Sequence, residues 1–257
     1  MNRELRKRIV ETVYRGKDGH IPSAFSITDI LDVLYSDYLK YDSSNPEWPG
    51  RDFFVLSKGH GCVALYAVLE KQGFLTEDDM YTFCQEGGIL GEHPDRTQVP
   101  GVEASTGSLG HGLPFAMGNA LAYRIRRMPN RVFVVVGDGE SNEGTIWETA
   151  LVAANLKLGN FCCIIDNNGS SDQILPVAPL KDKWEAFGWE TYVVDGHDEA
   201  ALKGVLDQLE FSPVGKPKAI VANTLKGKGV AMLEGHGTWH HRIPNEEEYH
   251  QIMEALS

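Results

Sequence analysis

The chain has 257 residues, of which 42% are hydrophobic, and a formal net charge of -12. That is enough apolar material for the core of one large α/β domain or of two small ones. Because acidic residues outnumber basic ones, the chain has no overall positive charge to attract nucleic acid or an anionic membrane. Neither is therefore expected as a partner. The four cysteines have no CxxC spacing, the amino terminus has no apolar leader, and no segment has the length of a membrane span. We therefore expect a globular cytoplasmic protein.

Helical and strand-like patterns alternate along the chain. Ser26 and Asp29 have the spacing of a capping box and predict a helix that begins there and ends near residue 39. A short strand at 53–57 precedes a helix that Gly73 ends, and Thr76 begins another helix. After a loop rich in glycine and proline, β-rich runs occupy 131–137, 160–166, 189–195 and 216–224, and helical patterns at 143–158, 179–187 and 198–209 separate them.

This alternation predicts the fold class. The apolar runs are continuous, which is typical of strands in a parallel sheet that helices cover on both faces. The sequence contains no internal repeat, linker or low-complexity tract. We therefore expect residues 1–257 to form a single doubly wound α/β domain with a mainly parallel sheet. Ligands of such sheets bind beyond the carboxyl ends of the strands.

Two of the predicted strands end in polar turns. Asp138 lies in "GDGESNEG" after one apolar run, and Asn168 lies in "DNNGSS" after the next. Parallel strands lie about 5 Å apart, so the two side chains reach one ion if their strands are adjacent or one apart. Mg²⁺ takes one or two such protein oxygens together with phosphate oxygens and water. The alternative is a pair of unrelated turns, because Asp-Gly and Asn-Asn-Gly form turns in any protein.

Two common nucleotide-binding motifs do not fit the glycine-rich segments. "GDGESNEG" departs from G-x-G-x-x-G because Gly144 falls two positions late. "LKGKGVAM" lacks the Lys-Ser or Lys-Thr that ends a P-loop. A Rossmann dehydrogenase and a P-loop hydrolase are therefore disfavoured.

A family resemblance follows from several ordered motifs. The "GDG" that begins at Gly137 and the "NN" that ends at Asn168 resemble the signature of thiamine diphosphate enzymes, with a spacing suited to one crossover helix and a strand. Other stretches resemble transketolase in particular, in that family's order: "DGHIPSAFS", "LSKGHGCVALYAVL", "GEHPD", "STGSLGHGLPFAMGNALA" and "KGKGVAMLEGHGTWHHRIPNEEEY". Together these motifs are far more specific than any one of them.

The resemblance covers only the first half of a transketolase. In that family an N-terminal domain holds the diphosphate of the cofactor and a second domain holds its aminopyrimidine ring. The resemblance therefore implies the diphosphate-binding subunit of a split transketolase, an enzyme of carbohydrate metabolism. A separate C-terminal, aminopyrimidine-binding subunit would complete it, and we expect an α2β2 heterotetramer.

The resemblance also assigns cofactor and metal residues. The side chains of Asp138 and Asn168 and the backbone carbonyl of Ser170 would hold Mg²⁺ or Ca²⁺. Glycine at 139 would let the backbone approach the diphosphate. The implied cofactor-binding set is His60, Gly107, Ser108, Leu109, Gly137, Asp138, Gly139, Glu143, Asn168 and His236. A helix cap or a plain turn is the simpler explanation for several of them.

Histidines suit the proton transfers of ketose chemistry because imidazole titrates near neutral pH. By resemblance, His20, His60, His93 and His236 would surround the reactive carbon of the cofactor. His240 is an alternative to His236, because the spacing of the tail differs from that of the fused enzymes. The remaining loop histidines are expected to be solvated surface residues: His197, His241 and His250.

Two departures from the family pattern affect segments that face the substrate. Pro22 stiffens the loop after His20, and "GSSDQILP" follows Asn168. The expected activity is transfer of a two-carbon ketol unit from a ketose, phosphorylated or otherwise acidic, to an aldose. The alternatives are one chain of a deoxyxylulose-phosphate synthase-like enzyme or of a decarboxylase, and a non-catalytic binding module. Small residues at 112–122 predict a helix that packs closely at a subunit interface or inside the domain.

Overall fold

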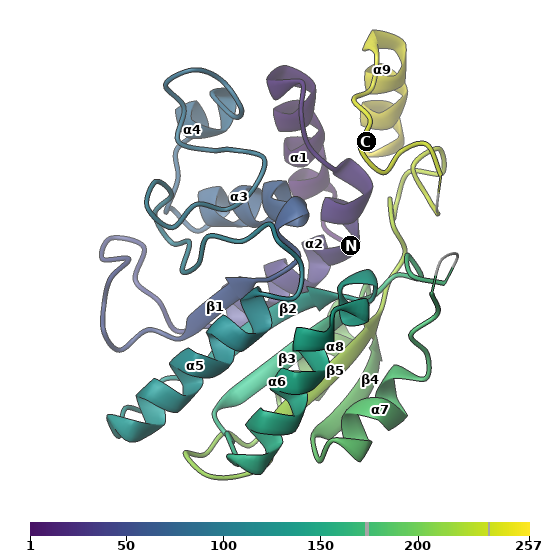
Figure 1. Cartoon of the computed structure of the whole chain (residues 1–257). Helices are drawn as coiled ribbons and strands as arrows, with labels where there is room; N and C mark the ends of the chain where they lie inside the picture. The colour runs from purple at the N-terminus through teal and green to yellow at the C-terminus, as the bar shows by residue number, and fades with distance from the viewer. Residues whose placement is uncertain (173–174, 236) are drawn as a thin grey trace.

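A five-stranded parallel sheet forms the centre of the molecule (Figure 1). The computed structural model describes residues 1–172, 175–235 and 237–257. The strand order is β1-β2-β3-β5-β4. The strands are β1 (Phe53–Leu56), β2 (Val132–Gly137), β3 (Phe161–Asn167), β4 (Glu190–Asp195) and β5 (Lys218–Asn223). Each lies within a predicted run or one residue beyond it, and the predicted parallel α/β sheet is confirmed.

Helices cover both faces of this sheet. On one face, α2 (Ile21–Val33), α3 (Cys62–Lys71) and α8 (Glu199–Leu206) pack on the strands, and α1 (Arg3–Gly16) packs on α2 and α3. On the other face lie α5 (Gly112–Ile125), α6 (Gly144–Asn155) and α7 (Leu180–Ala186), in front of the sheet in Figure 1. Along β2, Val135 faces the first core and Val134 the second, because strand side chains alternate. Continuous apolar runs in the sequence follow from having both faces covered.

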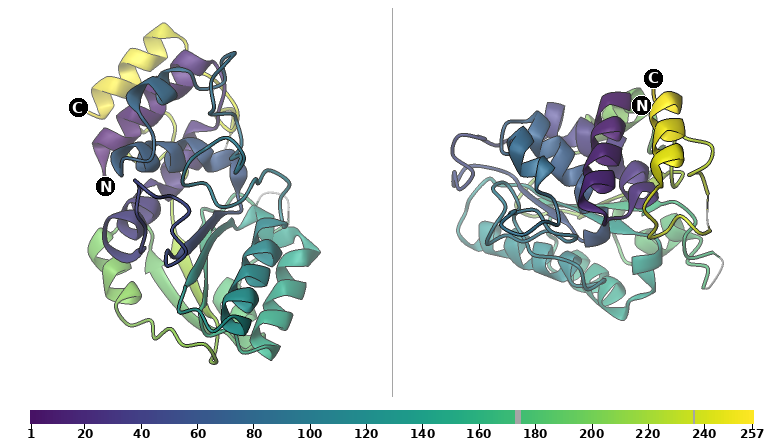
Figure 2. Two further views of the ribbon diagram at one scale, coloured as in Figure 1. Left: turned by 90° about the vertical axis from the view of Figure 1, so that its left-hand side faces the viewer. Right: turned by 90° about the horizontal axis from the view of Figure 1, so that it is seen from above.

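The two ends of the chain lie together. α9 (Glu246–Ala255) runs beside α1, as both views of Figure 2 show. The rings of Tyr14 and Tyr249 stack with centroids 4.3 Å apart, and Arg3 Nη1 donates to the carbonyl of Ser257 at 3.0 Å. The sequence analysis did not predict α1 or α9.

The start of α2 corrects one sequence-based prediction. The helix begins at Ile21, with Pro22 in its first turn, so Ser26 and Asp29 lie inside the helix and are buried. Proline is favourable at this position because its missing N–H has no helical partner there. The helix continues into a π-helical turn, Leu34–Tyr38. In contrast, α4 (Glu77–Tyr81) begins after Thr76, as the sequence predicts, and Thr76 and Asp79 form its capping box.

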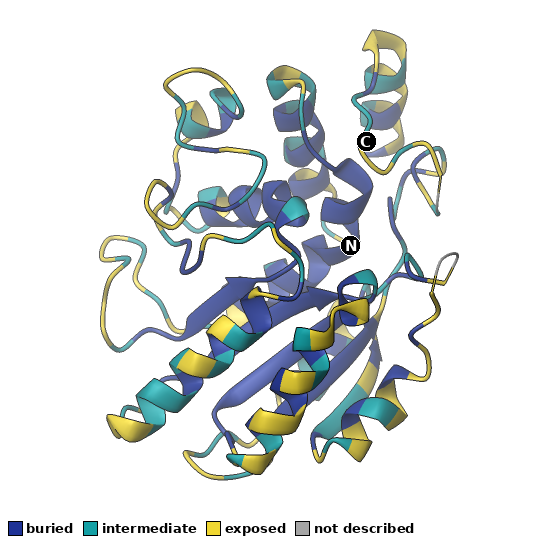
Figure 3. Ribbon diagram, viewed as in Figure 1, coloured by how far each residue is buried: buried dark blue, intermediate teal, exposed yellow. Residues whose placement is uncertain are grey.

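Burial follows this layered arrangement. Strands β1, β2, β3 and β5 are mostly buried, whereas the edge strand β4 and the outer sides of α5 and α6 are partly exposed (Figure 3). Large apolar side chains stand on those outer sides, including Phe115 and Ile125 of α5 and Leu151 and Val152 of α6. Among the described residues, no helix is both long enough and apolar enough to cross a membrane.

Candidate active site

The polar turns after β2 and β3 meet at one edge of the sheet. Gly137 pairs with Asp166, so the two strands are adjacent, and the N–H of Asp138 donates to the carbonyl of Asp166 at 3.1 Å. A 3-10 turn, Gly139–Asn142, then leads into α6. The sequence analysis required that the strands before Asp138 and Asn168 be adjacent or one apart if both side chains are to reach one ion. The pairing of β2 with β3 meets this condition.

Asp138 is a buried carboxylate with few partners. Its exposure is 1%, its Oδ1 accepts from the N–H of Gly139 at 2.8 Å, and its Oδ2 faces the N–H of Ser171 at 3.5 Å. Burial, followed by the charge of Asp166, raises the pKa of Asp138. No lysine or arginine among the described residues forms an ion pair with it. A cation at this position would offset the unfavourable burial of its charge.

The other two predicted metal ligands are in contact with each other. Asn168 Oδ1 accepts from the N–H of Ser170 at 3.0 Å and from its hydroxyl. Asn168 Nδ2 donates to Asp166 Oδ2 at 2.8 Å. All three predicted ligands thus lie on the two neighbouring loops at the carboxyl edge of the sheet.

Asp166 already has a cationic partner. Lys58 Nζ lies 2.5 Å from Asp166 Oδ2 in the buried interior, and the hydroxyls of Ser26 and Thr224 donate to the same carboxylate. Burial alone would raise the pKa of Asp166, but Lys58 and these hydrogen bonds lower it. Asp138 is therefore the carboxylate at this edge that is left for an external cation. The sequence analysis assigned no role to Lys58, although its place beside His60 in "SKGHG" was a signal.

Glu140 connects three segments of the site and was also missed. Its Oε1 accepts from Ser57 Oγ at 2.5 Å and from the N–H of Gly110 at 2.8 Å, and its Oε2 accepts from the N–H of Gly137 at 3.1 Å. Only 2% of the residue is exposed, and burial raises its pKa. These bonds hold the end of β1, the glycine-rich loop and the Gly-Asp-Gly turn together. A glutamate directly after "GDG" was the available signal.

Gly107, a predicted ring-binding residue, lies where the backbone is closely approached by neighbouring groups. A Cβ on Gly107 would lie 3.1 Å from His93 Cδ2, and one on Gly59 would lie 2.9 Å from the N atom of Gly107. The 3-10 turn Gly59–Gly61, which carries His60, therefore packs against this loop. Gly107 and Ser108 line a cleft of about 350 Å³. Leu109 is half-buried next to them, and Glu143 is exposed at the start of α6.

Three of the site histidines form a cluster. The ring centroids of His20 and His60 are 5.3 Å apart, those of His20 and His240 are 5.3 Å apart, and those of His60 and His240 are 6.0 Å apart. Burial, and then the neighbouring His241, His240 and His93, lowers the pKa of His20 to about 4. Burial, followed by the charge of Lys58, lowers the pKa of His60 to about 2. Both rings are therefore neutral at pH 7.

The sequence analysis also made predictions for four other histidines. His236 lies outside the described residues, so its predicted role stays a prediction. The expectation of a solvated His197 is wrong: its Nδ1 lies 2.9 Å from Asp29 Oδ2 and its Nε2 accepts from the N–H of Leu225. The ring of His241 is half exposed, but it stacks on His20 with centroids 4.5 Å apart. His250 is exposed, as expected.

A cleft of about 670 Å³ joins the metal-ligand loop to the histidine cluster. Ser170, Lys226 and His240 are among the residues that line it. Lys226 Nζ lies 3.0 Å from His240 Nδ1, and burial, followed by Lys58, lowers the pKa of Lys226 to about 8. The sequence analysis assigned no role to Lys226, although "KGKG" begins the last of the transketolase-like motifs. The cleft brings oxygen ligands, neutral imidazoles and one amine to a single place.

Comparisons with known proteins show the family of this chain. The family described as "Transketolase, thiamine diphosphate binding domain" matches residues 1–257. One of the subunits of the apulose-4-phosphate transketolase of Phocaeicola vulgatus is 37% identical over 98% of this chain and 91% of its own length. One of the subunits of the 6-deoxy-6-sulfo-D-fructose transketolase of a Clostridium species is 39% identical over 98% of this chain and 93% of its own length.

Solved structures show the same fold within longer chains. The transketolases of Leishmania mexicana and Campylobacter jejuni each match with a TM-score of 0.91 and 31% identity. The match covers 99% and 98% of this chain but only 40% and 41% of those proteins. The chain therefore belongs to the thiamine diphosphate binding domain family of the transketolases and corresponds to the thiamine diphosphate-binding, N-terminal chain of the split members.

Proposed function

We propose that this chain is the catalytic, diphosphate-binding subunit of a two-chain transketolase that transfers a two-carbon ketol unit from an acidic ketose to an aldose. One observation carries the proposal: a buried carboxylate without a protein cation, Asp138, lies at the same sheet edge as a cluster of neutral histidines. A module that only bound a partner would have no need of either feature.

The residues at this edge fit Mg²⁺ or Ca²⁺ and a diphosphate. Asp138, Asn168 and the carbonyl of Ser170 offer hard oxygen ligands, which both ions prefer. The ion would supply the positive charge that Asp138 lacks. A Cβ on Gly139 would meet nothing within 4 Å, so space is open beside the turn where a diphosphate would lie. Gly107, Ser108 and Leu109 are proposed to contact the cofactor ring, and His60 and Glu143 to border the bound cofactor.

Thiamine diphosphate supplies a nucleophilic carbon and an electron sink when it is bound. The task left to this chain is to orient the ketose and to move protons on its hydroxyl groups. His20, His60 and His240 are proposed to do so, with His93 beside Gly107. A protonated Lys226 donates to His240 Nδ1 and leaves the ring proton of His240 on Nε2. We keep His236 as a further candidate on the ground of its motif alone.

An acidic sugar is the proposed substrate class. The names of two relatives specify apulose-4-phosphate and 6-deoxy-6-sulfo-D-fructose, both of which carry an anionic group away from the carbonyl. Lys226 provides a cation in the cleft of this chain. The donor and acceptor of this enzyme are thus proposed to be sugar phosphates or sulfo-sugars.

A second subunit is proposed to complete the enzyme. Relatives of nearly the same length are named as subunits, which implies a companion chain, and this chain matches only 40% of a solved transketolase. We propose an aminopyrimidine-binding partner in an α2β2 assembly. The four cysteines are free and three of them are buried, which supports a location in the reducing cytoplasm.

The test is a transfer assay on the chain co-purified with its companion. With thiamine diphosphate and Mg²⁺, the complex should move two carbons from ketose phosphates or sulfo-ketoses to aldoses, detected by mass spectrometry of both products. Carbon dioxide release from pyruvate should stay at background. Pyruvate-dependent carbon dioxide release without ketol transfer would instead identify a decarboxylase or a deoxyxylulose-phosphate synthase-like enzyme.

A further inference from the structure

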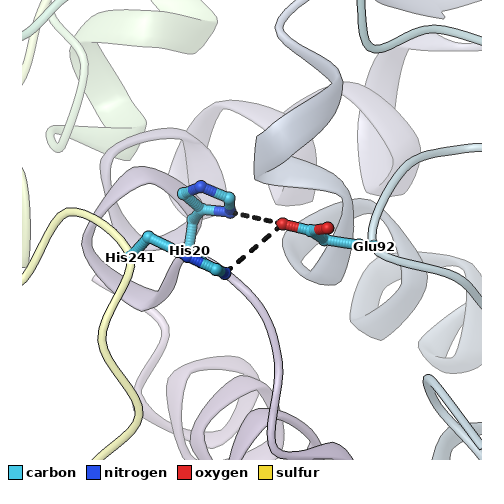
Figure 4. Close-up of side chains that lie close together, drawn as sticks. All are labelled: His20, Glu92 and His241. Atoms are coloured by element: carbon cyan, nitrogen blue, oxygen red, sulfur yellow. Dashed lines mark ion pairs between the residues drawn. The ribbon is translucent and has the colours of Figure 1, made fainter.

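We propose that His20, Glu92 and His241 form a second cation site, one that takes a transition metal such as Zn²⁺. Their side chains converge from three separate segments (Figure 4). His20 precedes α2, Glu92 lies in the loop before α5, and His241 lies in the tail before α9. One ligand atom from each lies within 4.8 Å of the other two.

An unpaired nitrogen points to a missing ligand. His20 Nδ1 is buried and has no hydrogen-bond partner among the described residues, and the residue as a whole is 9% exposed. The nearest acceptor, Glu92 Oε1, lies 3.8 Å away, which is too far for a hydrogen bond. Buried polar atoms almost always have a hydrogen-bond partner or another ligand. We therefore infer that the partner of this nitrogen comes from outside the protein.

The carboxylates beside the two imidazoles also favour a cation. Glu92 Oε1 lies 3.4 Å from His241 Nε2, and Asp18 Oδ1 is hydrogen-bonded to the same nitrogen at 2.9 Å, a bond that a metal on Nε2 would replace. Neither carboxylate forms an ion pair with a lysine or arginine anywhere in the described part of the chain. The rings of His20 and His241 stack with an interplanar angle of 27°, so both imidazoles approach Glu92 from one side.

The donor set selects the class of metal. Two imidazole nitrogens and one carboxylate oxygen match three-ligand Zn²⁺ sites, which keep a fourth position open for water. Ligands on a tetrahedral Zn²⁺ lie about 3.3 Å apart. The observed separations of 3.4 and 3.8 Å from Glu92 Oε1 are within reach of small side-chain movements. Mg²⁺ prefers oxygen ligands alone, so the proposed site differs in selectivity from the Asp138 site.

Occupation of this site has a functional consequence. A metal on Nδ1 would leave only Nε2 of His20 for proton exchange with a sugar hydroxyl. Zn²⁺ would therefore restrain the proposed transferase activity rather than support it. Binding of the ion itself depends only on the three side chains, so it can be tested without any activity measurement.

The experiment titrates the full-length, untagged and metal-stripped chain with Co²⁺, a spectroscopic substitute for Zn²⁺. We expect visible absorption from one nitrogen-ligated Co²⁺ per chain, which added Zn²⁺ removes. Glu92→Gln and His241→Gln should each weaken Co²⁺ binding by about tenfold to 100-fold or more, the range seen even for residues that only support metal ligands. Glu92 and His241 are partly exposed, and circular dichroism would verify that both variants fold.

Two matched controls separate this site from others on the chain. His250→Gln removes an exposed histidine elsewhere, and Asp138→Asn disables the proposed Mg²⁺ site. Both should keep the Co²⁺ absorption. The proposal is overturned if the wild-type chain gives no such absorption, if the absorption survives both Glu92→Gln and His241→Gln, or if only Asp138→Asn abolishes it.

Discussion

Asp138 and Asp166 are neighbouring buried carboxylates, but only Asp166 has a lysine beside it. A carboxyl whose pKa rises on folding destabilises the folded protein at neutral pH. Asp138 is therefore unfavourable for the stability of the metal-free chain, and the proposed cation would offset this cost.

We predict that Asp138→Ala abolishes measurable binding of thiamine diphosphate in the presence of Mg²⁺, measured by calorimetry on the assembled enzyme. The metal-free variant chain should be at least as stable as the wild type in urea, because the substitution removes an unpaired buried charge. Asp182→Ala, at an exposed position in α7, is the control and should bind the cofactor normally. Unchanged affinity in Asp138→Ala would refute the metal site.

A further buried carboxylate, Asp29, acts on the site from a distance. Arg6 Nη1 and Nη2 donate to its two oxygens at 2.9 and 2.8 Å, and His197 Nδ1 lies 2.9 Å from Oδ2. Arg6 also donates to the carbonyl of Lys228, and His197 Nε2 accepts from the N–H of Leu225. The network thus fixes the chain on both sides of Lys226.

We predict that Asp29→Asn lowers the free energy of unfolding at pH 7 by about 3–5 kcal/mol, because it leaves Arg6 buried without a counter-charge. Burial would raise the pKa of Asp29, but His197 and Arg6 lower it well below its usual range. The stabilisation is therefore present above about pH 4, the ordinary value for the unfolded chain, and is lost as the pH falls further. The difference in the free energy of unfolding between wild type and variant should be constant from pH 7 to about 5 and should decrease below about pH 4.

Urea unfolding across this pH range would measure the effect. Asp42→Asn is a suitable control because Asp42 is exposed and hydrogen-bonds only to nearby residues of its own turn. Asp42→Asn should change the free energy of unfolding by no more than about 0.5 kcal/mol. An equally small change in Asp29→Asn would contradict the structural role of the network.

Sequence reasoning found the site residues that follow strands and missed those that depend on distant contacts. Asp138 and Asn168 were accessible because strand ends of a parallel sheet meet at one edge. Glu140 and its partner Ser57 are 83 positions apart, and Lys58 and Asp166 are 108 positions apart. Nothing local in the sequence specifies such pairs, so only the folded chain reveals them.

At the level of elements, the strands were predictable, whereas the helices near the two ends of the chain, α1 and α9, were not. The strands are continuous apolar runs, whereas α1 and α9 are rich in charge and contact mainly other helices. The capping box proposed at Ser26 and Asp29 is wrong because distant groups bind both side chains. Ser26 donates to Asp166, and Asp29 pairs with Arg6.

The small residues of α5 lie on two different sides of the helix. Gly112, Ala116 and Ala120 are buried, and a Cβ on Gly112 would overlap Ser57. Gly118 has nothing within 4 Å of an added Cβ, and Phe115 is 47% exposed. Packing inside the domain is thus confirmed for one side, and a contact with another chain stays a prediction for the other.

We predict that Phe115→Asp and Leu151→Asp each weaken assembly with the partner subunit by about tenfold or more, because a buried unpaired charge would oppose an apolar contact. Sedimentation velocity on mixed subunits would measure this. The isolated variant chains should unfold like the wild type, since both side chains are exposed. Val214→Asp, which changes an exposed apolar residue in the loop before β5, should assemble normally. Normal assembly of all three variants would place the interface elsewhere.

At the scale of the whole molecule, the chain holds one part of an active site. The resemblance to transketolases implies that a glutamate of the second domain would activate the cofactor. Glu140 is unsuited to that role because Ser57, Gly110 and Gly137 occupy both of its carboxylate oxygens. Glu143, at the start of α6, is exposed and hydrogen-bonds to no side chain among the described residues.

We therefore predict that the isolated chain, supplied with thiamine diphosphate and Mg²⁺, has no measurable ketol transfer, and that adding the purified partner restores turnover of about 1 s⁻¹ or more. Light scattering on the mixture should give the mass of two copies of each chain, because most oligomers are symmetric and a cleft built across an interface occurs in pairs. A mixture that contains Asp138→Ala should assemble and remain inactive, which separates loss of the cofactor from loss of the partner. Turnover by the chain alone would show that its active site is complete without a second chain.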